Sequence, residues 1–431
     1  MPANKLLTLM KYIILILLFG INVCGFAQYE KYFHDKTLRM DYYHSGDNNQ
    51  EAYYFDELIE EPLCGGSKVN LIDTFEYGNY YLKVFSSSND SLLYSRGYSS
   101  LFGEWQTTNE AKEIQRSFSE AVVFPYPKQE VDVVLYSRSW DGIFEEKFRH
   151  KVNPDDYFIK EDRRLVYPTF NVHISGDPSK NVDIVILPEG YSSEEMGLFI
   201  DDCRAFADGL FTYAPYNKNK DKFNIVGVLA PSNDSGNDIP ANNIWKQTLL
   251  NTNFYTFDSE RYCMTMDNKS VRDLAANAPY DQIYILVNNE KYGGGAIYNY
   301  YNVSVNSNEK AAQIFIHELG HGFAGLADEY YTSSTSYNDF YNLEVEPWEP
   351  NITTIVDFEN KWKEMVKKKT PIPTPDTEKY INKVGVFEGG GYVAKGVYRP
   401  VHDCLMKSFS GDVFCPVCSK GIQDMIDFYS E

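Results

Sequence analysis

Basic residues are scarce in this sequence, and so are long apolar runs. The 431 residues include 40 Lys and Arg against 61 Asp and Glu, so the formal net charge is −21. A surface of that charge repels phosphate backbones, and no stretch dense in Lys or Arg interrupts it. Beyond residue 27 no segment is long and apolar enough to cross a bilayer. We therefore expect neither a nucleic-acid partner nor a transmembrane segment.

The first 27 residues have the pattern of a signal peptide. Residues 12–19 (YIILILLF) form an apolar run that is too short to span a bilayer. Gly25 and Ala27 then occupy the third and first positions before a small-residue cleavage site. Cys24 leaves a lipid anchor open as a second interpretation. We expect cleavage between Ala27 and Gln28, and a mature protein that is secreted, periplasmic or held at the cell surface.

Short β patterns fill the chain from about residue 28 to residue 160. Runs of alternating, β-branched or aromatic residues are separated by clusters of Gly, Ser, Asn or Pro, as in an antiparallel sandwich. The clearest runs are 37–43, 80–85, 91–94, 121–124 and 131–136. The sequence thus predicts an N-terminal antiparallel β-sandwich over 28–160, with no chemistry concentrated in it.

Beyond a polar boundary at 153–164, strands alternate with helices. Three continuous apolar runs predict buried strands: 182–187, 223–229 and 282–287. Ser192 and Glu195 form a capping box that opens a helix from 193 to about 210. Residues 296–305 predict a further strand, after a triplet of glycines. We therefore expect an α+β or α/β catalytic domain over 161–431 with a mixed sheet.

The candidate metal-ligating and catalytic residues lie in one segment, HELGHGFAGLADEY from 317 to 330. His317 and His321 are four residues apart on a predicted helix that is capped by Asn308, so both imidazoles project from one face about one turn apart. That separation lets two imidazole nitrogens share one Zn²⁺. Glu318 would then reach a water molecule rather than the metal, and act as general base.

A catalytic zinc takes three protein ligands, and two neighbouring carboxylates compete for the third place. Gly325 can end the helix in a left-handed conformation and turn the chain back toward the metal. Asp328 follows Gly325 by three residues, the spacing of Gly and third ligand in the metzincin pattern H-E-x-x-H-x-x-G-x-x-H/D. Here the glycine arrives one residue late. We favour Asp328, with Glu329 as the alternative.

Two other segments fit a zinc peptidase with a metzincin-like fold. The strand before the helix predicts a sheet edge to which an extended polypeptide adds as a further strand. Gly294, Gly295 and Ala296 would contact the substrate backbone there, because residues with little or no side chain allow close approach. Far downstream, Cys404-Leu405-Met406 is similar to the Met-turn that lies beneath the metal in metzincins.

These motifs resemble the bacterial IgA-peptidase family of zinc metalloendopeptidases. The resemblance rests on HELGHGFAGLADEY, on GVYRP from 396 to 400 and CLM from 404 to 406, and also on DIVILPEGY from 183 to 191, PIPTP from 371 to 375 and FEG from 387 to 389. The β region before residue 160 resembles the N-terminal domain of the family through weaker motifs. The resemblance thus extends over nearly the whole mature chain. The resemblance implies one zinc ion ligated by His317, His321 and Asp328, with Glu318 catalytic. It does not establish immunoglobulin A as the substrate.

Further site residues are expected on weaker grounds. Tyr398 and Arg399, just before the Met-turn-like segment, are candidates to stabilise the oxyanion of the tetrahedral intermediate. His402, Cys404, Cys415 and Cys418 form a compact set that could hold a second, structural Zn²⁺, although an exported protein favours disulfides or free thiols. The acidic loop DSGND from 234 to 238 could hold Ca²⁺, with a solvated turn as the default interpretation.

Three functions are compatible with these patterns. The first is a secreted zinc endopeptidase that cleaves extracellular proteins or glycoproteins, immunoglobulin A among the candidates. The second is a glycan- or protein-binding surface protein whose zincin-like part is not needed. The third is a zinc amidase that acts on cell-wall peptide. The intact His317, Glu318 and His321 argue against the second, and a long cleft along a sheet edge would distinguish the first from the third.

Overall fold

The computed structural model describes residues 28–161, 165–331 and 340–430. The expected signal peptide and Cys24 lie outside these residues. Within them, no helix combines the length and the apolar character that crossing a bilayer requires.

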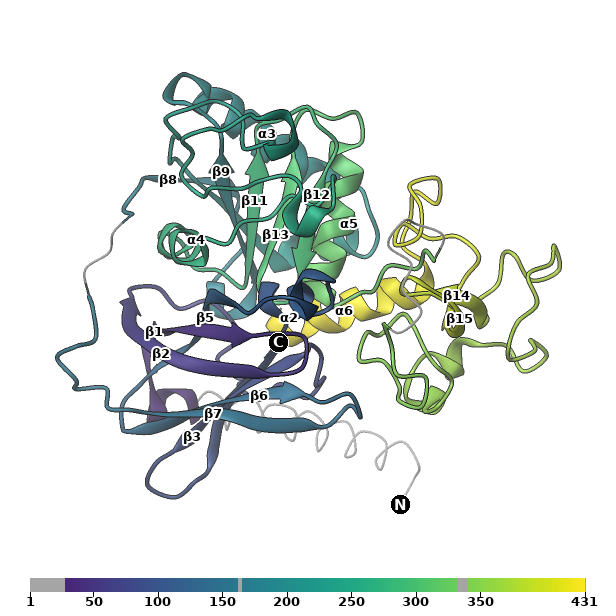
Figure 1. Cartoon of the computed structure of the whole chain (residues 1–431), viewed down its shortest axis with the longest axis horizontal. Helices are drawn as coiled ribbons and strands as arrows, with labels where there is room; N and C mark the ends of the chain where they lie inside the picture. The colour runs from purple at the N-terminus through teal and green to yellow at the C-terminus, as the bar shows by residue number, and fades with distance from the viewer. Residues whose placement is uncertain (1–27, 162–164, 332–339, 431) are drawn as a thin grey trace, which may run out of the picture.

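Two antiparallel sheets make up the N-terminal part, at the bottom of Figure 1. The three-stranded sheet has the order β2-β1-β5, and the four-stranded sheet has the order β4-β3-β6-β7. Their strands are β1 (Phe33–Gly46), β2 (Glu51–Glu61), β3 (Tyr80–Ser86), β4 (Leu92–Tyr98), β5 (Arg116–Pro127), β6 (Val131–Arg138) and β7 (Phe144–Val152). Inward side chains of both sheets, such as Leu38 of β1 and Val84 of β3, share one core. The expected antiparallel architecture is confirmed.

Two of these strands, β2 and β7, have no clear pattern in the sequence. Both are sheet edges, and β7 (FEEKFRHKV) buries only its last residue. Edge strands carry charged side chains because these discourage pairing with other chains. The same charges remove the hydrophobic alternation by which a strand is recognised.

A six-stranded mixed sheet forms the second part, with the order β12-β13-β11-β9-β10-β8. Its strands are β8 (Thr169–His173), β9 (Val182–Glu189), β10 (Phe223–Val228), β11 (Gln282–Val287), β12 (Gly294–Ile297) and β13 (Tyr301–Val305). The four central strands are parallel, and both edge strands are antiparallel to their neighbours. Every residue of β9 and β11 is buried, because helices cover both faces of the sheet.

The prediction of one strand over 296–305 is wrong. The segment is a hairpin of β12 and β13, in which Gly294 pairs with Ser304 and Ile297 with Tyr301. Asn299, in the turn between them, has a φ of 51°, a left-handed conformation that Asn tolerates better than most residues. The edge strand is therefore β12, and β13 lies inside the sheet.

Five helices accompany the mixed sheet, three on one face and two on the other. Side chains of α3, α5 and α6 share one core with β9 and β11, while those of α2 and α4 pack on the opposite face. Their bounds are α2 (Leu101–Gln106), α3 (Met196–Leu210), α4 (Asn268–Ala275), α5 (Ala311–Ala324) and α6 (Pro416–Ser430). The capping box of Ser192 and Glu195 is confirmed, and a 3₁₀ turn at Ser193–Glu195 precedes α3.

A small two-stranded hairpin lies apart from these three sheets. It consists of β14 (Phe387–Gly390) and β15 (Val393–Arg399), at the right of Figure 1.

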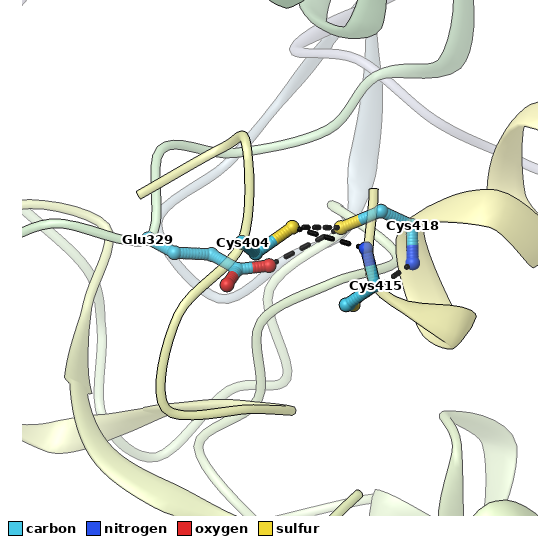
Figure 2. A group of neighbouring side chains, drawn as sticks. All are labelled: Glu329, Cys404, Cys415 and Cys418. Carbon is cyan, nitrogen blue, oxygen red and sulfur yellow. Dashed lines mark hydrogen bonds between the residues drawn. The ribbon is translucent and has the colours of Figure 1, made fainter. Parts of the chain in front are cut away.

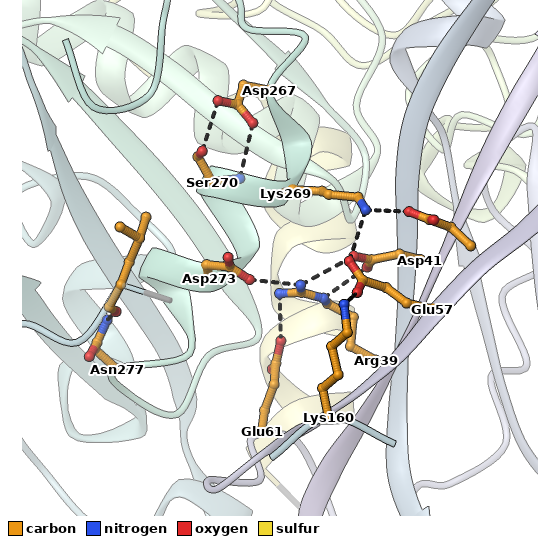
Figure 3. A network of polar contacts seen from close by, with 12 residues as sticks. Arg39, Asp41, Glu57, Glu61, Lys160, Asp267, Lys269, Ser270, Asp273 and Asn277 are labelled. Atoms are coloured by element: carbon orange, nitrogen blue, oxygen red, sulfur yellow. Dashed lines mark hydrogen bonds and ion pairs between the residues drawn. The ribbon is translucent and has the colours of Figure 1, made fainter. Parts of the chain in front are cut away.

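A buried charge network joins the first part to the second (Figure 3). The Arg39 guanidinium of β1 pairs with Asp41 at 2.8 Å, with Glu61 at 3.4 Å and with Asp273 of α4 at 2.7 Å. Arg39 and Asp41 are each only 1% exposed. An unpaired charge at this depth would be strongly unfavourable, so the network fixes the relative position of β1 and α4.

Candidate metal centre

The helix α5 carries the two histidines and ends at Gly325. Gly325 has a φ of 61° and caps the helix in the left-handed conformation, as the sequence predicts. Its backbone N–H donates to His321, and that of Leu326 donates to Gly320. The chain therefore reverses at once and leads Asp328 back to the helix face that presents the histidines. The expected Asn308 cap is wrong by two residues, since the N-cap is Lys310.

Three side chains converge at the end of this turn: His317, His321 and Asp328. The two Nε2 atoms lie 3.1 Å apart. Asp328 Oδ1 lies 3.2 Å from Nε2 of His317 and 3.4 Å from Nε2 of His321. For ligands at 2.0–2.2 Å from a zinc ion, the edges of a tetrahedron are about 3.3–3.6 Å. The three atoms have the spacing of three ligands around one ion.

Backbone carbonyls fix the orientation of both imidazoles. Nδ1 of His317 lies 3.1 Å from the carbonyl oxygen of Leu405, and Nδ1 of His321 lies 2.5 Å from that of Leu326. A carbonyl oxygen only accepts, so each Nδ1 carries a proton, and in a neutral imidazole the lone pair of Nε2 would then face Asp328. This is the arrangement that ligating histidines adopt in metal sites.

The electrostatics of the three groups favour positive charge between them. Burial by itself would lower the pKa of His321, but the Asp328 carboxylate raises it to about 9. Burial opposes ionisation of Asp328 as well, yet the two histidines hold the pKa of that carboxyl well below its usual range. Asp328 and His321 therefore stabilise each other's charged forms.

Glu318 lies between the histidines and the edge strand β12. A Cβ added at Gly294 would lie 3.4 Å from Glu318 Oε1 and 2.7 Å from the carbonyl oxygen of Val303, so only glycine fits there without displacing the chain. Burial raises the pKa of Glu318, which makes its carboxylate a stronger proton acceptor.

The outer edge of β12 is partly occupied by the chain itself. The N–H of Gly294 donates to Arg261, and the N–H of Cys263 donates to Gly294. Backbone groups of an antiparallel strand face its neighbour at every second residue, so Ala296 directs its N–H and C=O to the same outer side as Gly294. The part of the edge that an added strand can reach begins at Ala296.

The segment Cys404–Met406 lies against the base of the site. Leu405 supplies the carbonyl that holds His317. The fully buried Met406 packs against Gly320 of α5, where an added Cβ would lie 3.0 Å from its sulfur. The Met-turn-like segment thus lies beneath the two histidines.

Comparison with protein families covers both parts of the chain. The model described as IgA Peptidase M64 matches residues 170–382 and 376–426, and the Peptidase M64 N-terminus model matches residues 28–149. The chain belongs to the IgA peptidase M64 family. The M64 protein is therefore a peptidase. No curated protein matches it.

A second group of ligand-type side chains lies in the M64 peptidase next to the first. It consists of Glu329, Cys404, Cys415 and Cys418, all buried, with ligand atoms within 4.8 Å of one another. Figure 2 shows the Glu329 carboxylate directed toward the sulfur atoms of Cys404 and Cys418. The expected fourth member, His402, is wrong, because its Nε2 instead lies 3.4 Å from a carboxylate oxygen of Asp376.

Tyr398 and Arg399 lie on β15. Both Nη1 hydrogen bonds of Arg399 go to backbone carbonyls, those of Glu388 and Gly389 at 2.7 Å, and its side chain is 1% exposed. The backbone of Tyr398 pairs with Thr353. Among the described residues, no hydrogen bond or ion pair joins either side chain to the two histidines. Their role in oxyanion stabilisation stays a prediction.

The acidic loop 234–238, for which a solvated turn is the default interpretation and Ca²⁺ the alternative, has turn contacts. Oδ2 of Asp234 accepts from the N–H of Gln247, and Oδ1 of Asp238 accepts from the N–H of Lys246. Within the part of the chain that the structure describes, this loop is not one of the two groups with metal-ligand spacing.

Three residues near the site have no motif in the sequence. The hydroxyl of Tyr392 donates to Asp328 Oδ2, and that of Tyr262 donates to Glu104, which comes from α2. Burial raises the pKa of Glu104 to about 7, with His321 and Glu318 among the groups that act on it. Long-range packing alone brings these residues here, so no local pattern could have indicated them.

Proposed function

We propose that this M64 peptidase is a zinc-dependent endopeptidase of extracellular proteins or glycoproteins. The observation that carries the proposal is the triangle of Nε2, Nε2 and Oδ1 with edges of 3.1, 3.2 and 3.4 Å. Two neutral imidazoles and one carboxylate are a donor set of catalytic zinc sites. His317, His321 and Asp328 would hold the ion, which lowers the pKa of water and polarises a carbonyl when bound.

Glu318 would act as the proton carrier. Its carboxylate lies beside Gly294 of the edge strand, where the scissile peptide of a bound chain would lie. It takes a proton from the attacking water and passes it to the leaving amine nitrogen. The raised pKa of Glu318 supports its role as a base, because a carboxylate of higher pKa is a stronger proton acceptor.

An extended polypeptide would bind along β12 from Ala296 onward. Backbone hydrogen bonds along a strand give affinity without reading the side chains of the substrate. The edge position of β12 supports an endopeptidase, since a chain that pairs with this strand from Ala296 onward need not end at the site. Because Tyr262 and Glu104 lie at the same side, the N-terminal part would contribute to substrate contacts.

The decisive experiment compares Glu318→Gln and His321→Ala with the wild-type mature protein. Glu318→Gln should keep the zinc and reduce cleavage of a denatured protein by about 10²- to 10⁴-fold. His321→Ala should lose that zinc together with its activity. Glu309→Gln, at an exposed position just before α5, is the matched control and should change neither.

Purified immunoglobulin A and cell-wall peptide belong in the same assay, with products identified by mass spectrometry. Internal cleavage of proteins supports the proposal. Full cleavage by Glu318→Gln would overturn the role of that residue, and cleavage of cell-wall peptide alone would replace the endopeptidase with an amidase.

A further inference from the structure

Glu329, Cys404, Cys415 and Cys418 enclose a point next to the catalytic centre. From these contacts we infer that the four side chains bind a second zinc ion, whose role is structural. The site itself is independent of the proposed function, and only its effect on the catalytic centre rests on that function.

The sulfur spacing fits a tetrahedral ion. Sγ of Cys404 and Sγ of Cys418 lie 3.7 Å apart, and Sγ of Cys418 lies 3.2 Å from Glu329 Oε1. With a zinc–sulfur distance of about 2.3 Å, the sulfur–sulfur edge of a tetrahedron is about 3.8 Å. A ligand set of three soft thiolates and one carboxylate favours zinc over Mg²⁺ or Ca²⁺.

Backbone N–H groups already point at the sulfur atoms. The N–H of Cys415 donates to Sγ of Cys404 at 3.2 Å, and the N–H of Cys418 donates to Sγ of Cys415 at 3.4 Å. Cys415 and Cys418 lie at the start of α6, where the helix dipole favours negative charge. Both features stabilise thiolates, which are the form that binds a metal.

Glu329 supplies an independent observation. Its side chain is fully buried, with 0% exposure. Oε1 accepts from Asn351 at 3.1 Å and from Cys418, whereas Oε2 is buried without a hydrogen-bond partner. A buried carboxylate oxygen is rarely left in this state, because the loss of hydration is not compensated. A cation among the three sulfur atoms would compensate it.

A disulfide explains the group less well. A bond between Cys404 and Cys418 requires sulfur atoms about 2.05 Å apart. It would leave the Cys415 thiol unpaired, and no cation would balance the negative charge of the buried Glu329 carboxylate. Three thiols cannot all pair with one another. Four protein ligands with no position exposed to solvent are instead typical of a closed, structural zinc site.

The position of this site suggests what it stabilises. Glu329 follows Asp328, the proposed third ligand, and its N–H donates to Met406 at 2.8 Å. Cys404 precedes Leu405, whose carbonyl holds His317. One ion bound to Glu329 and Cys404 would therefore clamp together the two chain segments that orient His317 and Asp328 (Figure 2). This group acts on catalysis by positioning, since its members touch no substrate.

The test is metal content in four forms of the mature protein, namely wild type, His321→Ala, Cys418→Ser and Cys203→Ala. The wild type should hold about two zinc ions per chain, and each of the first two variants about one. Cys203→Ala removes a buried thiol of α3 and should keep both ions. X-ray absorption of the zinc in His321→Ala should show sulfur neighbours at about 2.3 Å.

The outcomes separate the two sites. One ion in the wild type that His321→Ala loses and Cys418→Ser keeps would overturn the second site and leave the proposed function standing. One ion in the wild type that Cys418→Ser loses and His321→Ala keeps would support the second site and overturn the proposed function.

Two measurements cover variants that fail to fold. The X-ray absorption spectrum of zinc can be recorded on His321→Ala alone. If it shows no sulfur neighbours around the zinc, the inference is overturned. Thiol titration of the denatured, unreduced wild type should find all six cysteines of the mature chain free, as they are in the structure. Only four free thiols, with a Cys404–Cys418 disulfide identified by mass spectrometry, would also overturn it.

Discussion

Asp328 and Glu329 are neighbours in the chain, yet their carboxylates face two different clusters. Asp328 Oδ1 lies 3.2 Å from Nε2 of His317, whereas Glu329 Oε1 lies 3.2 Å from Sγ of Cys418. Successive side chains in an extended segment point to opposite sides. One short segment therefore serves a histidine site on one side and a cysteine site on the other.

Asp328→Asn tests which of the two carboxylates holds the catalytic ion. We expect zinc affinity at the histidine site to fall by at least about 10- to 100-fold, the loss seen even for groups that merely orient a ligand. Peptidase activity should fall with it. Zinc release to a competing chelator measures the affinity. Asp412→Asn, an exposed carboxyl that contacts Gln313 of α5, is the control, and unchanged affinity in Asp328→Asn would show that Asp328 is not a ligand.

Gly294→Ala tests the approach of substrate to Glu318. The added Cβ would lie 2.7 Å from the Val303 carbonyl oxygen, so β12 must shift beside the Glu318 carboxylate. Since small misplacements in an active site are costly, kcat/KM should fall by about tenfold or more, with zinc content unchanged.

The matched substitution for this test is Gly197→Ala, because an added Cβ at Gly197 in α3 meets no atom within 4 Å. It should leave kcat/KM unchanged and raise stability slightly, as alanine does in a helix. Equal activity in Gly294→Ala and the wild type would mean that substrate does not bind along β12.

Arg39→Met tests the buried network between β1 and α4. The substitution leaves Asp41, Glu61 and Asp273 without their common cation, and breaking such a buried pair costs about 3–5 kcal/mol. Urea unfolding should show this loss in the free energy of unfolding. Arg116→Ala removes a more exposed pair with Glu110 at 2.9 Å and should cost at most about 1 kcal/mol. Equal effects of the two substitutions would refute the structural role of Arg39.

Asp183→Asn tests a pH dependence of stability. Burial and the neighbouring Asp281 carboxyl raise the pKa of Asp183 from 3.8 to about 9. The folded protein therefore holds a proton that the unfolded chain releases above pH 4, so stability is full below that pH and falls as pH rises toward 9. The substitution should flatten this decline and raise stability at pH 8 by about 1 kcal/mol or more.

Melting temperatures between pH 5 and 9 measure this effect. Asp201→Asn, an exposed carboxyl of α3, is the control and should keep the slope of the wild type. If the melting temperature of Asp183→Asn depended on pH as steeply as that of the wild type, Asp183 would be ionised in the folded protein.

The sequence by itself determined the local features of this protein. The four-residue spacing of His317 and His321, the left-handed cap at Gly325 and the capping box of Ser192 depend on residues within one or two turns of each other, and local geometry is encoded by local residues. The apolar runs of β9 and β11 were evident for the same reason, since strands covered on both faces need continuous apolar side chains.

The tertiary structure alone decided how distant segments combine. Spacing favoured Asp328 but left Glu329 open, and only the structure places Asp328 beside His317 and His321, and Glu329 beside Cys404, about 75 residues downstream. Three other findings also depend on contacts between distant segments. They are the presence of Glu329 rather than His402 among the cysteines, the edge position of β12, and the contact between Glu104 and Tyr262. Contacts between residues far apart in the chain are fixed by the packing of whole helices and sheets, which leaves no periodic trace near either residue.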